Sequence, residues 1–259
     1  MRSGKPAAAF AVLLVVSFAT MNAMPSDTLL AAMLQEAVLA LVALVAVRFA
    51  VPDALKRCTQ SVQQRNTVRF AGITLLLTGL VGGAITILTW YFANNGNGAG
   101  FVSAVLPSAV DLMENLLLLL GICLLTGLYE ESFMRVLGIE AFERALDTKR
   151  AILASAALFA LLHVGAPDVS AGQLVLLQTA LKFGQALLFG VILGALYVRT
   201  RRLWPCAFIH AGFDVLYLAP NVLLTGMMPE TYASGAVGDT VLLAVSVLML
   251  SGIVLKIRK

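Results

Sequence analysis

Three charged side chains stand at the end of a long apolar run. The segment "LYEESFMRVLG", residues 128–138, carries Glu130, Glu131 and Arg135. Charges at membrane depth are costly, so a sequence that keeps them usually pairs them or uses them. Glu131 and Arg135 are four residues apart, share a helix face and can form an ion pair. Glu130 points about 100° away, on the face of Met134.

The only two histidines of the chain lie in two other apolar runs. His163 ends "FALLH", four residues after Phe159, and His210 begins "HAGFD", four residues before Asp214. Each imidazole could serve as a base, a donor or a metal ligand. Asp214 could orient the His210 ring, or donate if protonated. Taken alone, each histidine is more often a structural residue of an apolar helix.

Ionisable groups in a membrane normally face one another or a wet cavity, so these groups are expected to share one pocket between three helices. Such a set suits hydrolysis. A buried glutamate can take a proton from water, and one imidazole can help to hold that water. A second imidazole and a polar neighbour can stabilise the oxyanion on the attacked carbonyl.

The same side chains could instead bind a divalent metal ion that activates the water. The sequence does not separate the two routes. It holds no H-E-x-x-H motif, and none of its three cysteines forms a CxxC pair. We therefore favour the route without a metal ion or other cofactor, with zinc as the alternative.

The composition defines the class of protein. Of 259 residues, 60% are hydrophobic and 12% are charged, whereas a soluble domain is roughly half apolar and a quarter charged. The whole chain, 1–259, is therefore expected to form one integral membrane domain. The net charge of +4 comes from short basic clusters between apolar runs, so nucleic acid is not an expected partner.

The apolar runs predict an all-α, polytopic membrane helix bundle of about eight transmembrane helices. The expected spans are 7–24, 28–47, 70–93, 111–137, 151–164, 174–198, 203–218 and 237–255. The first is expected to be a retained span, because "MNAMP" lacks a signal-peptide cleavage pattern. The fifth and seventh are short enough to be re-entrant or buried. A short interfacial helix is expected at 139–146, after Gly138.

Basic clusters follow every second span, and the loops between them are poor in Lys and Arg. The positive-inside rule therefore places both termini in the cytoplasm. Three further polar residues in apolar runs, Glu36, Lys182 and Gln185, are interpreted as structural. Lys182 lies near the outer end of its span, where its long side chain can reach the interface.

Three motifs in this order resemble the CPBP family, the CAAX proteases and bacteriocin-processing enzymes also called Abi. The resemblance covers residues 112–218 as the core and leaves 1–93 and 237–259 as peripheral spans. Its patterns are E-E-x-x-x-R, F-x-x-x-H and H-x-x-x-N or D, which here are Glu130-Glu131 with Arg135, Phe159 with His163, and His210 with Asp214.

The resemblance implies an intramembrane endopeptidase that cleaves a peptide or the tail of a membrane protein, lipidated or not, in a bacterial or archaeal plasma membrane. It makes Glu130 the general base and His163 its partner on the water. His210 and Asp214 form the oxyanion side, although CAAX proteases have Asn at the latter position. The supporting residues are Glu131, Arg135 and Phe159.

Other hypotheses account for the same residues. A non-catalytic relative could act as an immunity or scaffolding protein, and a zinc-dependent protease could use the same residues. A transporter with a proton relay predicts an internal repeat, which the sequence does not show.

A shared pocket for the two histidines also places a geometric requirement on the helices. His163 lies roughly 20 Å beyond Arg150, but His210 only roughly 12 Å beyond Arg202, so a common depth requires the fifth span to tilt or to start above the membrane.

Overall fold

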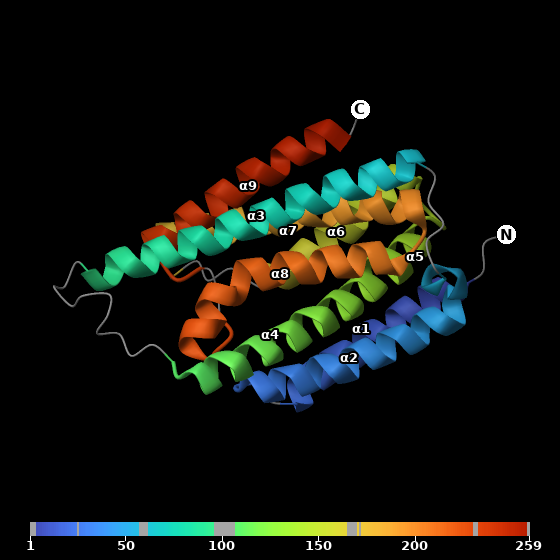
Figure 1. Ribbon diagram of the computed structural model, residues 1–259. Coiled ribbons are helices and arrows are strands. Elements are labelled where there is room, and N and C mark those ends of the chain that lie inside the picture. The colour runs from blue at the N-terminus through green and yellow to red at the C-terminus, as the bar shows by residue number, and fades with distance from the viewer. Residues whose placement is uncertain are drawn as a thin grey trace.

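The computed structural model describes residues 4–24, 26–56, 62–95, 107–164, 170, 172–229 and 233–257. In these parts of the chain the secondary structure is entirely helical, which confirms the predicted all-α class (Figure 1). The long helices are α1 (Lys5–Ala23), α2 (Leu29–Ala50), α3 (Val62–Asn95), α4 (Ala109–Glu130), α6 (Thr148–Val164), α7 (Gln173–Thr200), α8 (Leu203–Thr225) and α9 (Val237–Ile257). The short elements are the 3-10 turn η1 (Pro52–Leu55), the π-helix η2 (Glu131–Ile139) and α5 (Glu140–Phe142).

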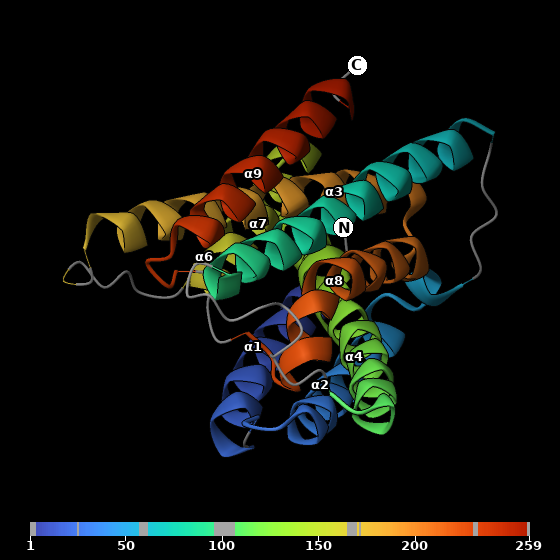
Figure 2. The ribbon, with the colours of Figure 1, turned by 60° about the vertical axis from the view of Figure 1, so that its left-hand side comes forward.

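Seven of the described helices are long and apolar enough to cross a membrane. The remaining predicted span, the fifth at 151–164, corresponds to α6, which has 17 residues and is short, as expected. The polytopic membrane bundle is therefore confirmed. Figure 2 shows α1, α2 and α4 grouped on one side, with α3, α7 and α9 on the other.

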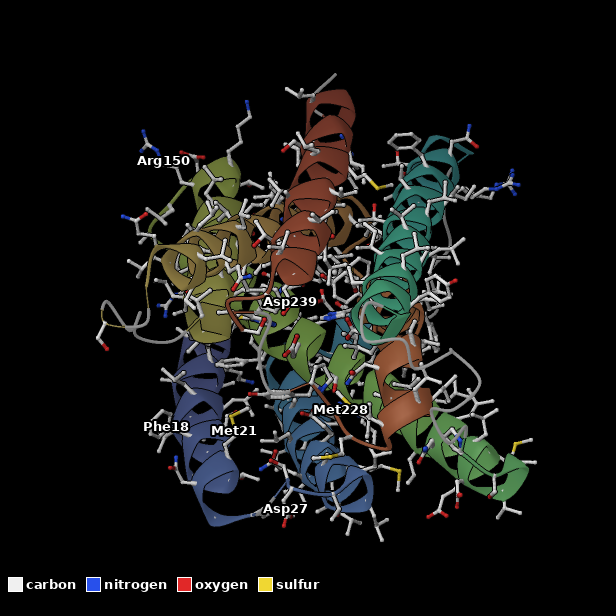
Figure 3. All side chains as sticks on the ribbon, turned by 90° about the vertical axis from the view of Figure 1, so that its left-hand side faces the viewer. Phe18, Met21, Asp27, Arg150, Met228 and Asp239 are labelled. Carbon is white, nitrogen blue, oxygen red and sulfur yellow. The ribbon has the colours of Figure 1, made fainter. Side chains whose placement is uncertain are left out.

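Helix α1 begins and helix α9 ends at the same end of the bundle as the α2–η1 and α7–α8 connections (Figure 1). This is the arrangement that an even number of passes produces. We call it the basic end, because Arg48, Lys56 and Arg202 lie in or beside these connections and Arg150 lies in the first turn of α6. The opposite end carries Asp27 and Asp239 and faces the viewer in Figure 3. The positive-inside rule predicts that the basic end faces the cytoplasm.

Helix α8 is longer than the predicted span 203–218, because it continues to Thr225 with Pro220 inside it. The helix bends in this region (Figure 1). Proline removes one backbone hydrogen bond, which membrane helices tolerate when neighbours satisfy the freed groups. The helix ends where Gly226 adopts the left-handed conformation, with φ 68°.

The backbone of α8 lies directly against α3 and α4. A Cβ atom added to Gly79 of α3 would lie 2.8 Å from the Phe213 carbonyl oxygen, and one added to Gly127 of α4 would lie 2.6 Å from that of Ala207. Small residues allow this close approach between membrane helices. Because Gly127 lies one turn before Glu131, this contact brings the end of α4 beside the part of α8 that carries His210.

The predicted interfacial helix at 139–146 does not form as a separate element. Ile139 is the last residue of η2 and is fully buried, and α5 adds only three residues after it. Gly138 does not end the membrane helix. Instead, a Cβ atom there would lie 3.2 Å from the Phe10 ring. The close approach of α1 therefore keeps this segment inside the bundle.

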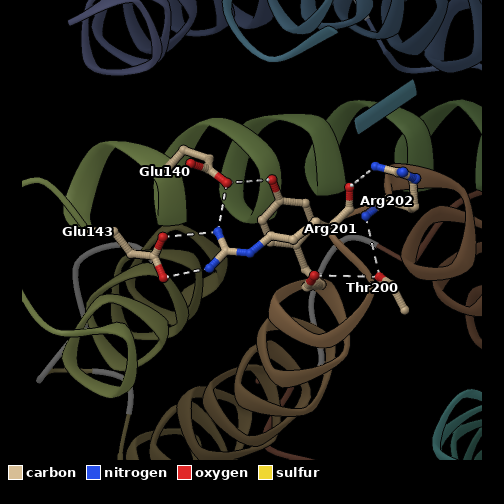
Figure 4. Close-up of polar contacts among 6 residues, drawn as sticks. Glu140, Glu143, Thr200, Arg201 and Arg202 are labelled. Atoms are coloured by element: carbon tan, nitrogen blue, oxygen red, sulfur yellow. Dashed lines mark hydrogen bonds and ion pairs between the residues drawn. The ribbon is translucent and has the colours of Figure 1, made fainter. Parts of the chain in front are cut away.

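An ion-pair network fixes the chain just beyond η2 to the turn between α7 and α8 (Figure 4). Arg201 donates through Nη1 and Nη2 to the two carboxylate oxygens of Glu143, at 2.9 and 2.8 Å, and through Nη1 to Glu140 Oε1, at 2.7 Å. The Tyr197 hydroxyl donates to the same Glu140 oxygen at 3.1 Å. Although burial opposes its charge, the hydrogen bonds that it donates to Glu143 and the nearby charge of Glu140 raise the pKa of the Arg201 guanidinium.

We expect Arg201→Ala to lower the free energy of unfolding by about 3 kcal/mol, the low end of the range for a broken buried pair. The Glu143 side chain is 0% exposed and would lose its bidentate partner, whereas Arg201 itself is 36% exposed. Thermal unfolding in detergent measures the change. The control is Arg150→Ala, whose pair with Asp147 is solvent-exposed and should contribute at most about 1 kcal/mol. Equal losses in the two variants would contradict a structural role for the network.

Candidate active site

The first sequence motif spans the junction between α4 and the π-helix η2. Glu130 is the last residue of α4 and Glu131 is the first of η2. All nine residues of η2 are buried. The Ser155 hydroxyl of α6 donates to the Met134 carbonyl at 2.6 Å and so fixes η2 to α6. π-Helical turns are rare and frequently occur at functional sites.

His210 of α8 lies at the centre of the polar cluster. Its Nδ1 is 2.8 Å from Glu131 Oε1. Its Nε2 is 3.3 Å from Asp214 Oδ2 and 3.5 Å from Glu130 Oε2. Both ring nitrogens therefore face carboxylates, and one imidazole joins the first motif to the third.

Arg135 and Glu131 form the ion pair that their spacing predicts, with 3.1 Å between Nε and Oε2. The two side chains are only 1% and 0% exposed. Neither terminal nitrogen of Arg135 has a hydrogen-bond partner among the described residues. Its guanidinium instead lies 4.2 Å from the centre of the Phe159 ring, a cation–π contact.

Phe159 connects the two histidines. Its ring centroid is 4.1 Å from that of His163 and 6.3 Å from that of His210. The two imidazoles therefore reach a common region of the bundle, as the shared pocket requires. His163 Nδ1 is 2.9 Å from the Phe159 carbonyl oxygen, which can only accept a hydrogen bond. The proton therefore lies on Nδ1, which leaves the lone pair on Nε2.

Exposure divides the cluster into two parts. The side chains of Glu130 and Asp214 are 21% and 20% exposed, while those of His210 and Glu131 are 4% and 0% exposed. His163 is also exposed. The ion pairs of the described site join Glu130 to His210 and not to His163. A water molecule or substrate can thus reach two carboxylates and one imidazole, while the residues behind them are shielded.

Two residues that the sequence interpretation set aside face this site. Glu36 of α2 lies beside Thr126, one turn before Glu130, and its Oε2 is buried without a hydrogen-bond partner in the described part of the chain. Lys182 of α7 donates to Gln185 at 3.1 Å, and Gln185 donates to the Tyr217 hydroxyl at 3.0 Å. The expectation that Lys182 reaches outward to the interface is therefore wrong, because its ammonium group hydrogen-bonds inward to Gln185. The sequence contained a signal for both residues, because an ionisable residue inside a membrane helix suggests a function by default.

The alternative of a zinc site stays a prediction. Within the described ranges, no group of three or more His, Cys, Asp or Glu side chains is arranged to hold a metal ion. His210, the natural first ligand, has both ring nitrogens directed at carboxylates.

Comparison with known protein families agrees with this arrangement. Residues 112–216 match the family described as type II CAAX prenyl endopeptidase Rce1-like. The matched segment contains all three motifs, so the core of the chain is similar to this family. The membrane bundle and this family match together favour a CAAX-type intramembrane protease. No curated protein matches the chain.

Proposed function

We propose that the protein is a glutamate-dependent, metal-independent endopeptidase that cleaves a peptide or the tail of a membrane protein within the bilayer. The observation that carries the proposal is the position of His210, between the buried Glu131 and the accessible Glu130 and Asp214. A histidine with a purely structural role needs only one partner. His210 also directs its Nε2 atom toward Glu130 and Asp214, the two accessible carboxylates of the cluster.

Glu130 is the proposed general base. It lies at 21% exposure beside Nε2 of His210 and can accept a proton from a water molecule. That water also donates to the lone pair on Nε2 of His163. The hydroxide formed attacks the peptide carbonyl carbon. Glu130 then returns the proton to the leaving nitrogen as the C–N bond breaks, so that the base is regenerated.

His210 is the proposed oxyanion donor. Its Nδ1–H donates to Glu131, whose other oxygen is held by Arg135. An N–H on Nε2 can then point at the oxygen of the attacked carbonyl. This requires a doubly protonated ring, and the surrounding carboxylates supply the negative charge that offsets it. Asp214 accepts from Nε2 in the resting site, a role that a carboxylate can fill where CAAX proteases have Asn.

The proposed substrates are peptides or membrane-protein tails, lipidated or not, that approach from the bilayer of a bacterial or archaeal plasma membrane.

The test uses purified protein in proteoliposomes with prenylated and unprenylated CAAX-type peptides. Mass spectrometry detects loss of the last three residues or cleavage elsewhere. We expect His163→Gln and His210→Gln each to lower the cleavage rate at least 100-fold, because each removes a group from the reacting atoms.

The two remaining alternatives give different results. A non-catalytic immunity or scaffolding protein cleaves none of the peptides, and the histidine variants keep its phenotype. A zinc-dependent protease purifies with stoichiometric zinc and is inactivated by a chelator. Full activity in both folded histidine variants would exclude the proposed mechanism.

A further inference from the structure

A groove lies on the surface of the bundle near the basic end, and none of its lining residues belongs to the polar cluster. The groove has a volume of about 550 Å³ and lies over α7, between α6 and α9, which both pack against α7. Ligand sites typically measure 300–1,000 Å³. Most of its lining is apolar and includes Leu153, Val191, Ala195 and Val254.

Two basic residues close one end of this groove. Lys149 lies in the first turn of α6 and Arg199 in the last turn of α7, and both side chains are exposed. The apolar lining extends from there toward the bilayer centre. Val191 lies eight residues before Arg199, which corresponds to roughly 12 Å along the helix. The groove therefore combines a positively charged rim at headgroup level with an apolar wall at acyl-chain level.

We propose that this groove binds an anionic phospholipid. The phosphate lies between Lys149 and Arg199, with the Thr148 hydroxyl at the same rim, and an acyl chain lies along α7. Charge complementarity selects this occupant. A zwitterionic lipid brings a cationic group to a rim that already carries two positive charges, whereas an anionic lipid does not. Basic pockets between membrane helices on the cytoplasmic side bind anionic headgroups in this way.

The site is separate from the proposed peptidase chemistry. None of its residues belongs to the three motifs, and its polar rim lies at the basic end rather than at His210. Occupancy would brace α6, which is the shortest of the spanning helices and carries His163.

The test uses the full-length protein in a neutral detergent. Phosphatidylglycerol and phosphatidylcholine with identical acyl chains are titrated, and native mass spectrometry counts the retained lipids while thermal unfolding follows stabilisation. We expect phosphatidylglycerol to be retained preferentially. Lys149→Gln and Arg199→Gln should each weaken its retention roughly fivefold. Ala195→Trp, which fills the groove, should abolish it.

The matched control is Arg150→Gln. Arg150 neighbours Lys149 on the same helix but pairs with Asp147 and points away from the bundle (Figure 3). It should leave retention unchanged. Equal retention of the two lipids, equal loss in Arg150→Gln, or unchanged retention in folded Ala195→Trp would each overturn the proposal. Stabilisation by glycerol phosphate or inorganic phosphate as strong as that by the lipid would also overturn it, because the apolar groove would then contribute nothing.

Discussion

Replacing Glu130 with glutamine is expected to lower the rate of peptide cleavage about 1,000-fold, within the range for removal of a general base. Glutamine has nearly the same shape, so substrate binding should change little and the loss should appear in kcat rather than KM. Initial rates in proteoliposomes, followed by mass spectrometry, measure both constants. The control is Glu114→Gln, an exposed carboxylate on the same helix, which should retain full activity.

The stability of the Glu130→Gln variant distinguishes a catalytic role of Glu130 from a structural one. Glu130 Oε2 is buried without a hydrogen-bond partner among the described residues and lies near Asp214 and Glu36, which are also acidic. The substitution removes a like charge beside Asp214 and Glu36 but also a carboxylate beside His210, so the two effects oppose each other and the unfolding temperature should change little. Active sites often keep such unfavourable groups at a cost in stability. A fully active variant, or one that is inactive only because it unfolds, would contradict the assignment of Glu130 as base.

Much of the site could be predicted because helical periodicity sets which neighbours meet. The spacing of four placed Arg135 on Glu131 and Asp214 on His210, and the structure shows contacts of 3.1 and 3.3 Å. The cost of charge in a membrane then predicted that these pairs would gather in one pocket. Alternating basic loops likewise predicted a chain that begins and ends on the same side of the bundle.

The parts that could not be predicted depend on tertiary contacts without a sequence period. A π-helix differs from an α-helix by one residue per hydrogen-bonded ring, and no residue pattern in "ESFMRVLGI" distinguishes the two. The continuation of α8 through Pro220 depends on neighbouring helices. Glu36 became part of the site only through the packing of α2 against α4, which hydropathy does not encode.

The second prediction with a large expected effect concerns the buried ion pair between Arg135 and Glu131. Arg135→Ala is expected to lower the free energy of unfolding by about 3–5 kcal/mol, because it leaves the fully buried Glu131 carboxylate without its guanidinium. It also removes the cation that covers Phe159. Thermal unfolding in detergent and the yield of folded protein measure the loss. A variant as stable as the parent would show that His210 alone compensates the Glu131 charge.

A double variant, Glu131→Gln with Arg135→Met, distinguishes folding from catalysis. Replacing both members of a buried pair by groups of similar volume is often neutral for stability, so the protein should fold. Activity should still fall about 10- to 100-fold, because an amide holds the His210 Nδ1–H less firmly than a carboxylate does. The pH profile of kcat should shift as well, since His210 loses a negative neighbour, whereas a pair with only a structural role would leave that profile in place. Recovery of both stability and full activity would therefore assign Glu131 and Arg135 to folding alone and leave Glu130, His163, His210 and Asp214 to act without them.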